Sequence, residues 1–167
     1  MIKIDELKFI IGRFDHYFDS VNSKGNLYLT LNTFLLGGAI GGYAVLLTNH
    51  VCSLAWPELV IMGAIGVCNI IAYLYSMLAI YPFVSKRLGN SYIFYGDIAG
   101  RTETEWKTLF AAVQGPVYEQ DLVFQAHQLA GGLQKKYRRM RTATWWMFAE
   151  FVFFIIGIFY LVIKHFS

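Results

Sequence analysis

Three long apolar runs constrain this chain more than any other feature of its sequence. A helix needs roughly 20 mostly apolar residues to cross the hydrocarbon core of a bilayer. Residues 27–47 and 59–84 carry no charge, and residues 143–163 carry only Glu150. Charged residues make up 15% of the chain, whereas a soluble domain usually has about 25%. The sequence therefore predicts an all-α integral membrane protein with three transmembrane helices.

The basic residues predict how these spans are oriented. The segment before the first span holds four Lys and Arg residues, the loop 48–58 holds none, the segment 85–142 holds nine and the tail holds only Lys164. Short loops rich in Lys and Arg stay on the cytoplasmic side. We therefore expect the N-terminus and residues 85–142 in the cytoplasm, and the C-terminus on the periplasmic or extracellular side.

The segments outside the spans predict a helical cytoplasmic layer. Residues 1–26 read as an amphipathic helix that could continue into the first span, and residues 118–140 as a second helix with an apolar stripe. Thr102 and Glu105 form a capping-box pattern that begins a short helix ending near Gly115. Residues 91–98 read as a short extended or turn segment. We expect the whole chain, 1–167, to form a single domain. The stripe consists of Leu122, Ala126, Leu129, Leu133 and Tyr137.

Small and polar residues inside the spans leave two alternatives open. Glycines four residues apart let helix backbones approach closely, either within one protomer or between protomers. Asn32 and Asn69 need polar partners because lipid offers none, so with Glu150 they either join helices or line a pore. The glycines of the first span are Gly37, Gly38, Gly41 and Gly42.

The chain lacks the motifs that mark common enzymes and metal sites. It has no H-E-x-x-H, C-x-x-C, Walker-type phosphate loop or G-x-S-x-G. Its four histidines lie far apart in the sequence and do not have the spacing of metal ligands. We therefore expect no enzymatic activity, no metal and no cofactor.

Three polar clusters outside the spans hold groups suited to a nucleotide. A phosphate needs Lys, Arg or backbone N–H groups, and a base needs an aromatic face with amide-like partners. Acids and bases at a membrane interface also pair with one another, with lipid headgroups or with water, and the basic run 135–141 also fits a cytoplasmic anchor. By themselves, the residue types indicate no more than an anion site. The clusters are Asp15, Asp19, Asn22 and Lys24; Gly96, Asp97 and Arg101; and Asp121, Gln125, Lys135, Lys136 and Tyr137.

At these clusters the sequence resembles the Pycsar membrane effectors, which are also described as nucleotide-sensing transmembrane proteins. Residues 18–25 (FDSVNSKG) are similar to the family's opening signature, and residues 92–98 (YIFYGDI) to its Phe-Gly-Asp-Ile segment, with Tyr95 where a second Phe is more usual. Asp121, Gln125 and the pair 136–137 are similar to its last cytoplasmic helix. The order of helices and spans agrees as well.

The resemblance implies a bacterial antiviral effector in the inner membrane. A cyclase partner senses phage and makes a cyclic nucleotide, typically cyclic UMP or cyclic CMP, although some relatives accompany cyclic oligonucleotides. The effector, expected to be a homo-oligomer, binds this signal and impairs the membrane, so that growth stops or the cell dies. The chain has no separate cyclic-nucleotide-binding domain, so the ligand must bind the helical layer. The residues expected to bind it are Asp19, Asn22, Lys24, Phe94, Gly96, Asp97, Asp121, Gln125, Lys136 and Tyr137.

Two other functions remain open at this stage. A small channel or transporter subunit without nucleotide input would need a polar face along its spans, and these spans are mostly apolar. A membrane scaffold would instead recruit a soluble partner through its cytoplasmic helices.

Overall fold

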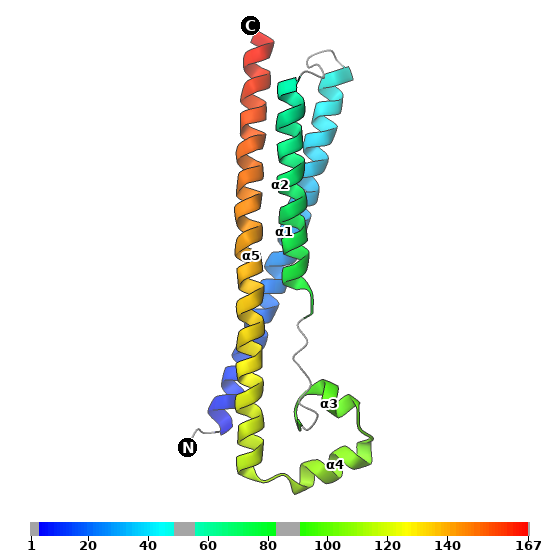
Figure 1. Ribbon diagram of the computed structural model, residues 1–167, viewed down its shortest axis with the longest axis vertical. Coiled ribbons are helices and arrows are strands. Elements are labelled where there is room, and N and C mark those ends of the chain that lie inside the picture. Colours follow the sequence, from blue (N-terminus) through cyan, green and yellow to red (C-terminus); the bar gives the residue numbers. More distant parts are fainter. Residues whose placement is uncertain (1–3, 49–55, 83–90, 167) are drawn as a thin grey trace. The chain divides into compact units, whose positions relative to one another are not determined.

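The computed structural model describes residues 4–48, 56–82 and 91–166, which form helices and contain no strand. Five helices follow one another (Figure 1). Three of them contain a stretch long and apolar enough to cross a membrane, so the predicted fold class is confirmed. The helices are α1 (Ile4–Thr48), α2 (Trp56–Ile80), α3 (Tyr95–Ala99), α4 (Glu103–Ala112) and α5 (Gly115–Phe166).

The two longest helices each join a predicted helix outside the membrane to a span, a continuity that the sequence had suggested for the first of them. α1 has 45 residues and joins the N-terminal amphipathic segment to the first span without a break at Gly25. α5 has 52 residues and continues from the segment 118–140 into the third span, through Gly131. Because roughly 20 residues cross a bilayer, both helices extend well beyond their spans.

Two predicted boundaries are wrong. α2 ends at Ile80 rather than continuing toward residue 84, because Pro82 disfavours helical backbone in the residue before it. The segment 91–98, predicted as extended or turn, has that form only up to Phe94, since α3 begins at Tyr95. Lys86 and Arg87, two of the nine basic residues counted in segment 85–142, lie outside the described residues.

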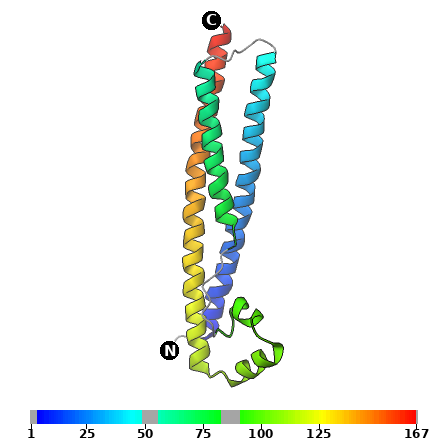
Figure 2. The same cartoon turned by 45° about the vertical axis from the view of Figure 1, so that its right-hand side comes forward.

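The chain divides into two compact units. The loop unit comprises Met1–Ser20 and Pro82–Lys135, and the bundle unit comprises Val21–Tyr81 and Lys136–Ser167. In the bundle unit, α2 and the adjoining parts of α1 and α5 run side by side (Figures 1 and 2). At most 28% of the residues in the most apolar window of each spanning helix are buried. The remaining apolar surface faces outward, as it does in a protein whose solvent is lipid. The single domain predicted from the sequence stays a prediction.

Within the bundle unit, the glycines differ in how closely atoms of another helix approach them. A Cβ added at Gly157 would lie 3.2 Å from Cγ2 of Ile61, so α5 passes close to α2 there. A Cβ added at any of the four glycines of the first span would meet no atom within 4 Å among the described residues, the local helix backbone aside. Of the two alternatives left open by the sequence, close packing of these four glycines within one protomer is therefore not seen among the described residues.

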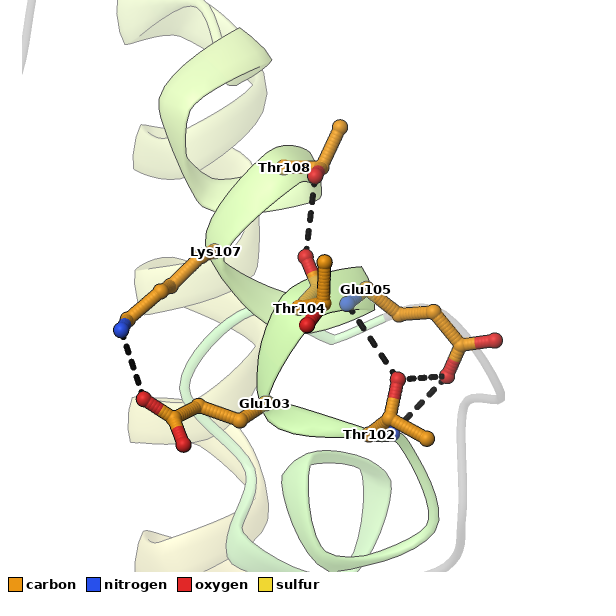
Figure 3. Close-up of polar contacts among 6 residues, drawn as sticks. All are labelled: Thr102, Glu103, Thr104, Glu105, Lys107 and Thr108. Atoms are coloured by element: carbon orange, nitrogen blue, oxygen red, sulfur yellow. Dashed lines mark hydrogen bonds and ion pairs between the residues drawn. The ribbon is translucent and has the colours of Figure 1, made fainter.

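None of the residues of α4 is buried, and local hydrogen bonds cap its start. The Thr102 hydroxyl accepts from the Glu105 backbone N–H at 3.3 Å, and a Glu105 carboxylate oxygen accepts from the Thr102 N–H at 2.8 Å (Figure 3). This is the predicted capping box. The Thr102 N–H and, next in importance, the Thr102 hydroxyl both donate to the Glu105 carboxylate at 2.8 Å, and these two hydrogen bonds lower the pKa of Glu105. Because the folded-state pKa is lowered, the stability that the Glu105 carboxylate adds to the helix is present above its unfolded-state pKa. That stability is lost as pH falls through the folded-state value.

Thr102→Ala is expected to open α4 without disturbing the rest of the protein. Losing an N-cap costs about 1 kcal/mol, so the amides of α4 should exchange with deuterium about fivefold faster. Thr108→Ala is the control, because Thr108 donates only back to the Thr104 carbonyl of its own helix and alanine has the higher helix propensity. Equal exchange rates in the two variants would contradict the importance of the cap.

Candidate functional site

A buried serine organises the loop unit. Ser91 is 1% exposed, and its hydroxyl donates to the carboxylate of Asp121, with both oxygens at 3.0 Å. The same hydroxyl oxygen accepts from the backbone N–H of Phe94 at 2.9 Å. The backbone N–H of Ser91 donates to Asp97 at 3.0 Å. Ser91, Asp97 and Asp121 thus form a hub, the Ser91 hub, which ties the segment before α3 to both α3 and α5.

The two acids beside Ser91 are occupied by the backbone of this segment. Asp97 is 6% exposed and Asp121 is 7% exposed. Asp121 also accepts from the backbone N–H of Tyr92 at 2.8 Å. A buried carboxylate that accepts several hydrogen bonds fixes its donors in place. These contacts give both acids a role in shaping the loop around Ser91.

A cleft of about 450 Å³ lies next to this hub, within the loop unit. One wall contains the aromatic residues Phe94 and Tyr95, whose ring centroids lie 4.9 Å apart. Gln125 of α5 and the charged residues Lys8 and Asp15 of α1 also line it. Small-molecule pockets typically have roughly 300–1,000 Å³. The cleft therefore has the size and the mixture of aromatic, amide and charged groups that a nucleotide requires.

Two of the residues that line the cleft are tied to the Ser91 hub. Gln125 is 8% exposed, and its amide nitrogen donates to the Ser91 hydroxyl at 3.4 Å. Phe94 is 7% exposed and is held through its backbone N–H. The hub therefore sets the position of both the aromatic and the amide part of the cleft.

Gly96 is packed against the ring of Phe94. A Cβ added at Gly96 would lie 2.7 Å from Cε1 of that ring, closer than two carbons can approach without a shift. The backbone N–H groups of Asp97 and Ile98 both donate to the Phe94 carbonyl. Gly96 therefore supports the cleft by admitting the ring, and the two amides that follow it already have an acceptor.

In the bundle unit, two cationic side chains of α5 donate hydrogen bonds to backbone carbonyls at the C-terminal end of α2. Lys136 donates to the Ala79 carbonyl at 2.7 Å, and Arg139 donates to the Leu78 carbonyl at 2.7 Å. The last carbonyls of a helix have no partner within it, and cations are favourable at that end. Lys136 also donates to the Asn22 side chain at 3.2 Å. This cluster links α1, α2 and α5.

Lys136 is 4% exposed. Burial lowers the pKa of its ammonium group, and the neighbouring charge of Arg139 lowers it further. An anion near Lys136 would offset both effects, because an opposite charge favours the charged form.

Seven of the ten residues expected from the sequence come together, in two groups. Phe94, Gly96, Asp97, Asp121 and Gln125 come together in the loop unit. Asn22 and Lys136 come together in the bundle unit. The side chains of Asp19, Lys24 and Tyr137 are exposed.

Three residues that matter to this geometry were missed from the sequence. Ser91 had no signal, because a single serine before a helix is too common a feature to single out. Lys8 lies on the polar face of an amphipathic helix, where a lysine is ordinary. Arg139 was assigned only to the basic run, although helix ends attract cations. The described residues contain no group of three or more His, Cys, Asp or Glu side chains that could hold a metal ion.

Comparison with known proteins gives one result. A family model described as the Pycsar effector protein domain matches residues 6–163. No curated protein and no solved structure matches the chain.

Proposed function

Because the chain belongs to the Pycsar effector family, a family of antiphage defence, we propose that it binds a cyclic nucleotide and then impairs the membrane. Its role lies in Pycsar antiphage defence and its place is in a membrane. The proposal adds the cyclic nucleotide as the signal and the impairment of the membrane as its effect. Cyclic UMP and cyclic CMP are the favoured ligands, and a cyclic oligonucleotide is the alternative.

The cleft in the loop unit carries this proposal. The flat face of a nucleobase would stack on Phe94 or Tyr95, as bases do on aromatic side chains. The Gln125 amide offers a donor and an acceptor for the edge of the base. Lys8 would pair with the cyclic phosphate, and the Asp15 carboxylate would accept a hydrogen bond from the ribose hydroxyl. The cleft therefore provides a partner for each part of the ligand.

The other residues predicted to bind the ligand enter the proposal through different roles. Asp97 and Asp121 position the cleft through Ser91. Gly96 leaves space for the Phe94 ring. Direct contact of the ligand with Asp19, Asn22, Lys24, Lys136 or Tyr137 stays a prediction from the sequence.

The switch in the bundle unit would involve the end of α2. Lys136 and Arg139 stabilise that end in the structure, and α1 and α5 each run without a break through residues of both units. A ligand that displaces residues of α1 or α5 could therefore change the bundle. To act as a switch, it must bind the active state more tightly, and a tenfold preference supplies only about 1.4 kcal/mol.

The setting of the protein is also part of the proposal. We place it in the bacterial inner membrane as a homo-oligomer, with the N-terminus and residues 85–142 in the cytoplasm. The lysine and arginine count supports this orientation. It also puts the cleft residues on the side where a cyclase would release its product.

The function is tested in bacterial cells that make the protein together with a cyclase for cyclic UMP or cyclic CMP. Wild type should depolarise the membrane and stop growth only when the cyclase is active. The Phe94→Ala variant, at equal abundance in the membrane, should neither depolarise the membrane nor stop growth. Depolarisation without any cyclase would favour a channel without nucleotide input. If the membrane potential never changes although the ligand is bound, the proposed damage is wrong.

Gly96→Ala is expected to weaken ligand binding at least tenfold while the protein stays folded. The new methyl group would displace the Phe94 ring from the wall of the cleft. Gly131→Ala is the control, because a Cβ there meets no atom within 4 Å among the described residues. Alanine within a helix is favoured over glycine by roughly 0.5–1 kcal/mol, so this variant should bind the ligand normally and unfold at a slightly higher temperature. Calorimetry with cyclic UMP and cyclic CMP measures the ligand affinity of both variants. Equal affinities would contradict the role of Phe94.

A further inference from the structure

Three polar side chains are buried together among the three spans. Asn32 of α1 and Glu150 of α5 are 0% exposed, and Asn69 of α2 is 3% exposed. All three belong to the bundle unit. Glu150 is the seventh residue after Ala143, so it lies about 10 Å along the helix from the predicted start of the third span, at 1.5 Å per residue. Ionisable residues at such depth are rare and usually mark ion or proton pathways.

The amide of Asn69 connects the three helices. Its nitrogen donates to the backbone carbonyl of Asn32 at 2.8 Å and to one carboxylate oxygen of Glu150 at 2.9 Å. A single side chain of α2 thereby contacts both α1 and α5 through polar groups.

These hydrogen bonds leave part of the cluster unsatisfied. The second carboxylate oxygen of Glu150 and both polar atoms of the Asn32 side chain are buried without a hydrogen-bond partner among the described residues. Each such atom carries the cost of its desolvation without a compensating hydrogen bond, and lipid cannot supply the missing partner. A purely structural connection between helices would not need these three atoms. Native proteins retain such groups where an ion, a water molecule or a reaction uses them.

The chemistry of the cluster selects for positive charge. Glu150 brings the formal negative charge, its hydrogen-bond partner Asn69 is neutral, and the carbonyl of Asn32 adds another oxygen. Rings of carbonyl oxygens and carboxylates are what cation pathways use in place of water. An anion would meet the carboxylate and be repelled.

We infer that Glu150, Asn69 and Asn32 form the cation site of the membrane leak, at which K⁺ or H⁺ crosses the activated protein. The inference rests on the proposed function, because it specifies the damage that the bound signal causes. In the structure the cluster is closed, since its side chains are fully buried. Activation separates the helices enough to admit the cation to oxygen atoms that already lack partners.

The test uses the full-length protein in vesicles of phosphatidylethanolamine and phosphatidylglycerol, with cyclic UMP as the probe. Vesicles filled with KCl and diluted into low KCl report selectivity through a voltage-sensitive dye, because K⁺ efflux makes the interior negative and Cl⁻ efflux makes it positive. In a second set, valinomycin fixes the potential and a trapped pH dye reports proton entry. The two sets separate K⁺ from H⁺.

The decisive variant is Glu150→Gln. Its side-chain oxygen can still accept the hydrogen bond from Asn69, so the helices stay connected while the charge is lost. We expect cation flux to fall at least tenfold, with unchanged binding of cyclic UMP in a thermal-shift assay. Ser76→Ala is the control, because Ser76 is equally buried but donates to the Ala72 carbonyl of its own helix. This variant should conduct like wild type.

The other outcomes are distinguishable. An interior-positive potential, or release of a large trapped dye with no potential, would overturn the cation site, as would equal flux through Glu150→Gln and wild type. If cyclic UMP binds and no flux appears in either set, the proposed membrane damage fails and this site fails with it. If cyclic UMP does not bind at all, the failure lies in that choice of ligand, and the same flux assay with cyclic CMP then supports or overturns the cation site.

Discussion

Replacing Gly25 with alanine is expected to destabilise the bundle unit by about 3 kcal/mol, at the upper end of the range for overpacking. A Cβ at this position would lie 2.2 Å from Cγ2 of Ile80 and 3.4 Å from Cε of Met140. Carbon atoms in contact normally lie about 3.5–4.0 Å apart. Cγ2 of Ile80 is attached directly to a branched Cβ, whose rotamer is stiff, so the helices α1 and α2 must move apart.

Thermal unfolding in detergent measures this effect. For a chain of this size, about 3 kcal/mol corresponds to a fall in Tm of about 6–12 °C. Gly41→Ala is the matched control in the same helix, because a Cβ there meets no atom within 4 Å among the described residues. Ile80→Ala should partly rescue Gly25→Ala by removing the clashing methyl group, which a double-mutant cycle would detect. Equal melting of the two glycine variants would contradict the packing of α1 on α2.

Replacing Asp121 with alanine should release the segment around Ser91 and abolish ligand binding in the cleft. The change leaves the Ser91 hydroxyl and the Tyr92 N–H without their acceptor. Hydrogen bonds to charged groups contribute about 1.5–3 kcal/mol each, and a buried donor without an acceptor carries its own penalty. We expect a local loss of about 3 kcal/mol. Asp121→Asn should lose less, because the amide oxygen still accepts one of these bonds.

Hydrogen exchange measures this loss where it occurs. Amides in residues 91–98 should lose protection by about a hundredfold, which corresponds to about 3 kcal/mol, while those of α2 stay unchanged. Glu119→Ala removes a charge two residues away on the same helix and serves as the control. Unchanged protection of residues 91–98 in Asp121→Ala would show that the hub does not hold this segment.

The sequence predicted the parts of this fold that depend on local signals. The three spans follow from apolar runs, and the capping box at Thr102 follows from two residues three positions apart. The end of α2 was misplaced because apolar composition continues past Pro82, whereas backbone geometry does not. The orientation of the spans and the single domain stay predictions.

The candidate site was less predictable because tertiary contacts define it. Asp97 and Asp121 were expected to face a ligand, but in the structure both accept hydrogen bonds from the backbone beside Ser91. Lys136 was expected to bind a phosphate, and it donates to the end of α2. A sequence gives the charge of such residues but not the partner that occupies them. Phe94 and Gln125 were both expected at the site, and both line the cleft.

The polar residues of the spans illustrate the same limit. The sequence left open whether Asn32, Asn69 and Glu150 join helices or line a pore. The structure has Asn69 bonded to both other helices and leaves the second carboxylate oxygen of Glu150 without a partner among the described residues. One cluster can therefore connect the resting bundle and provide oxygen atoms for a cation when it opens.

Binding of a cyclic nucleotide to the cleft is the central claim, and calorimetry on detergent-purified protein tests it most directly. The ligands are cyclic UMP, cyclic CMP and a set of cyclic oligonucleotides, and the variants are Phe94→Ala and Lys8→Ala, with Lys107→Ala as a control on the exposed surface of α4. The account predicts that one ligand binds wild type and the control equally and binds both cleft variants at least tenfold more weakly. Folded wild-type protein that binds none of these ligands, or cleft variants that bind as wild type does, would contradict it.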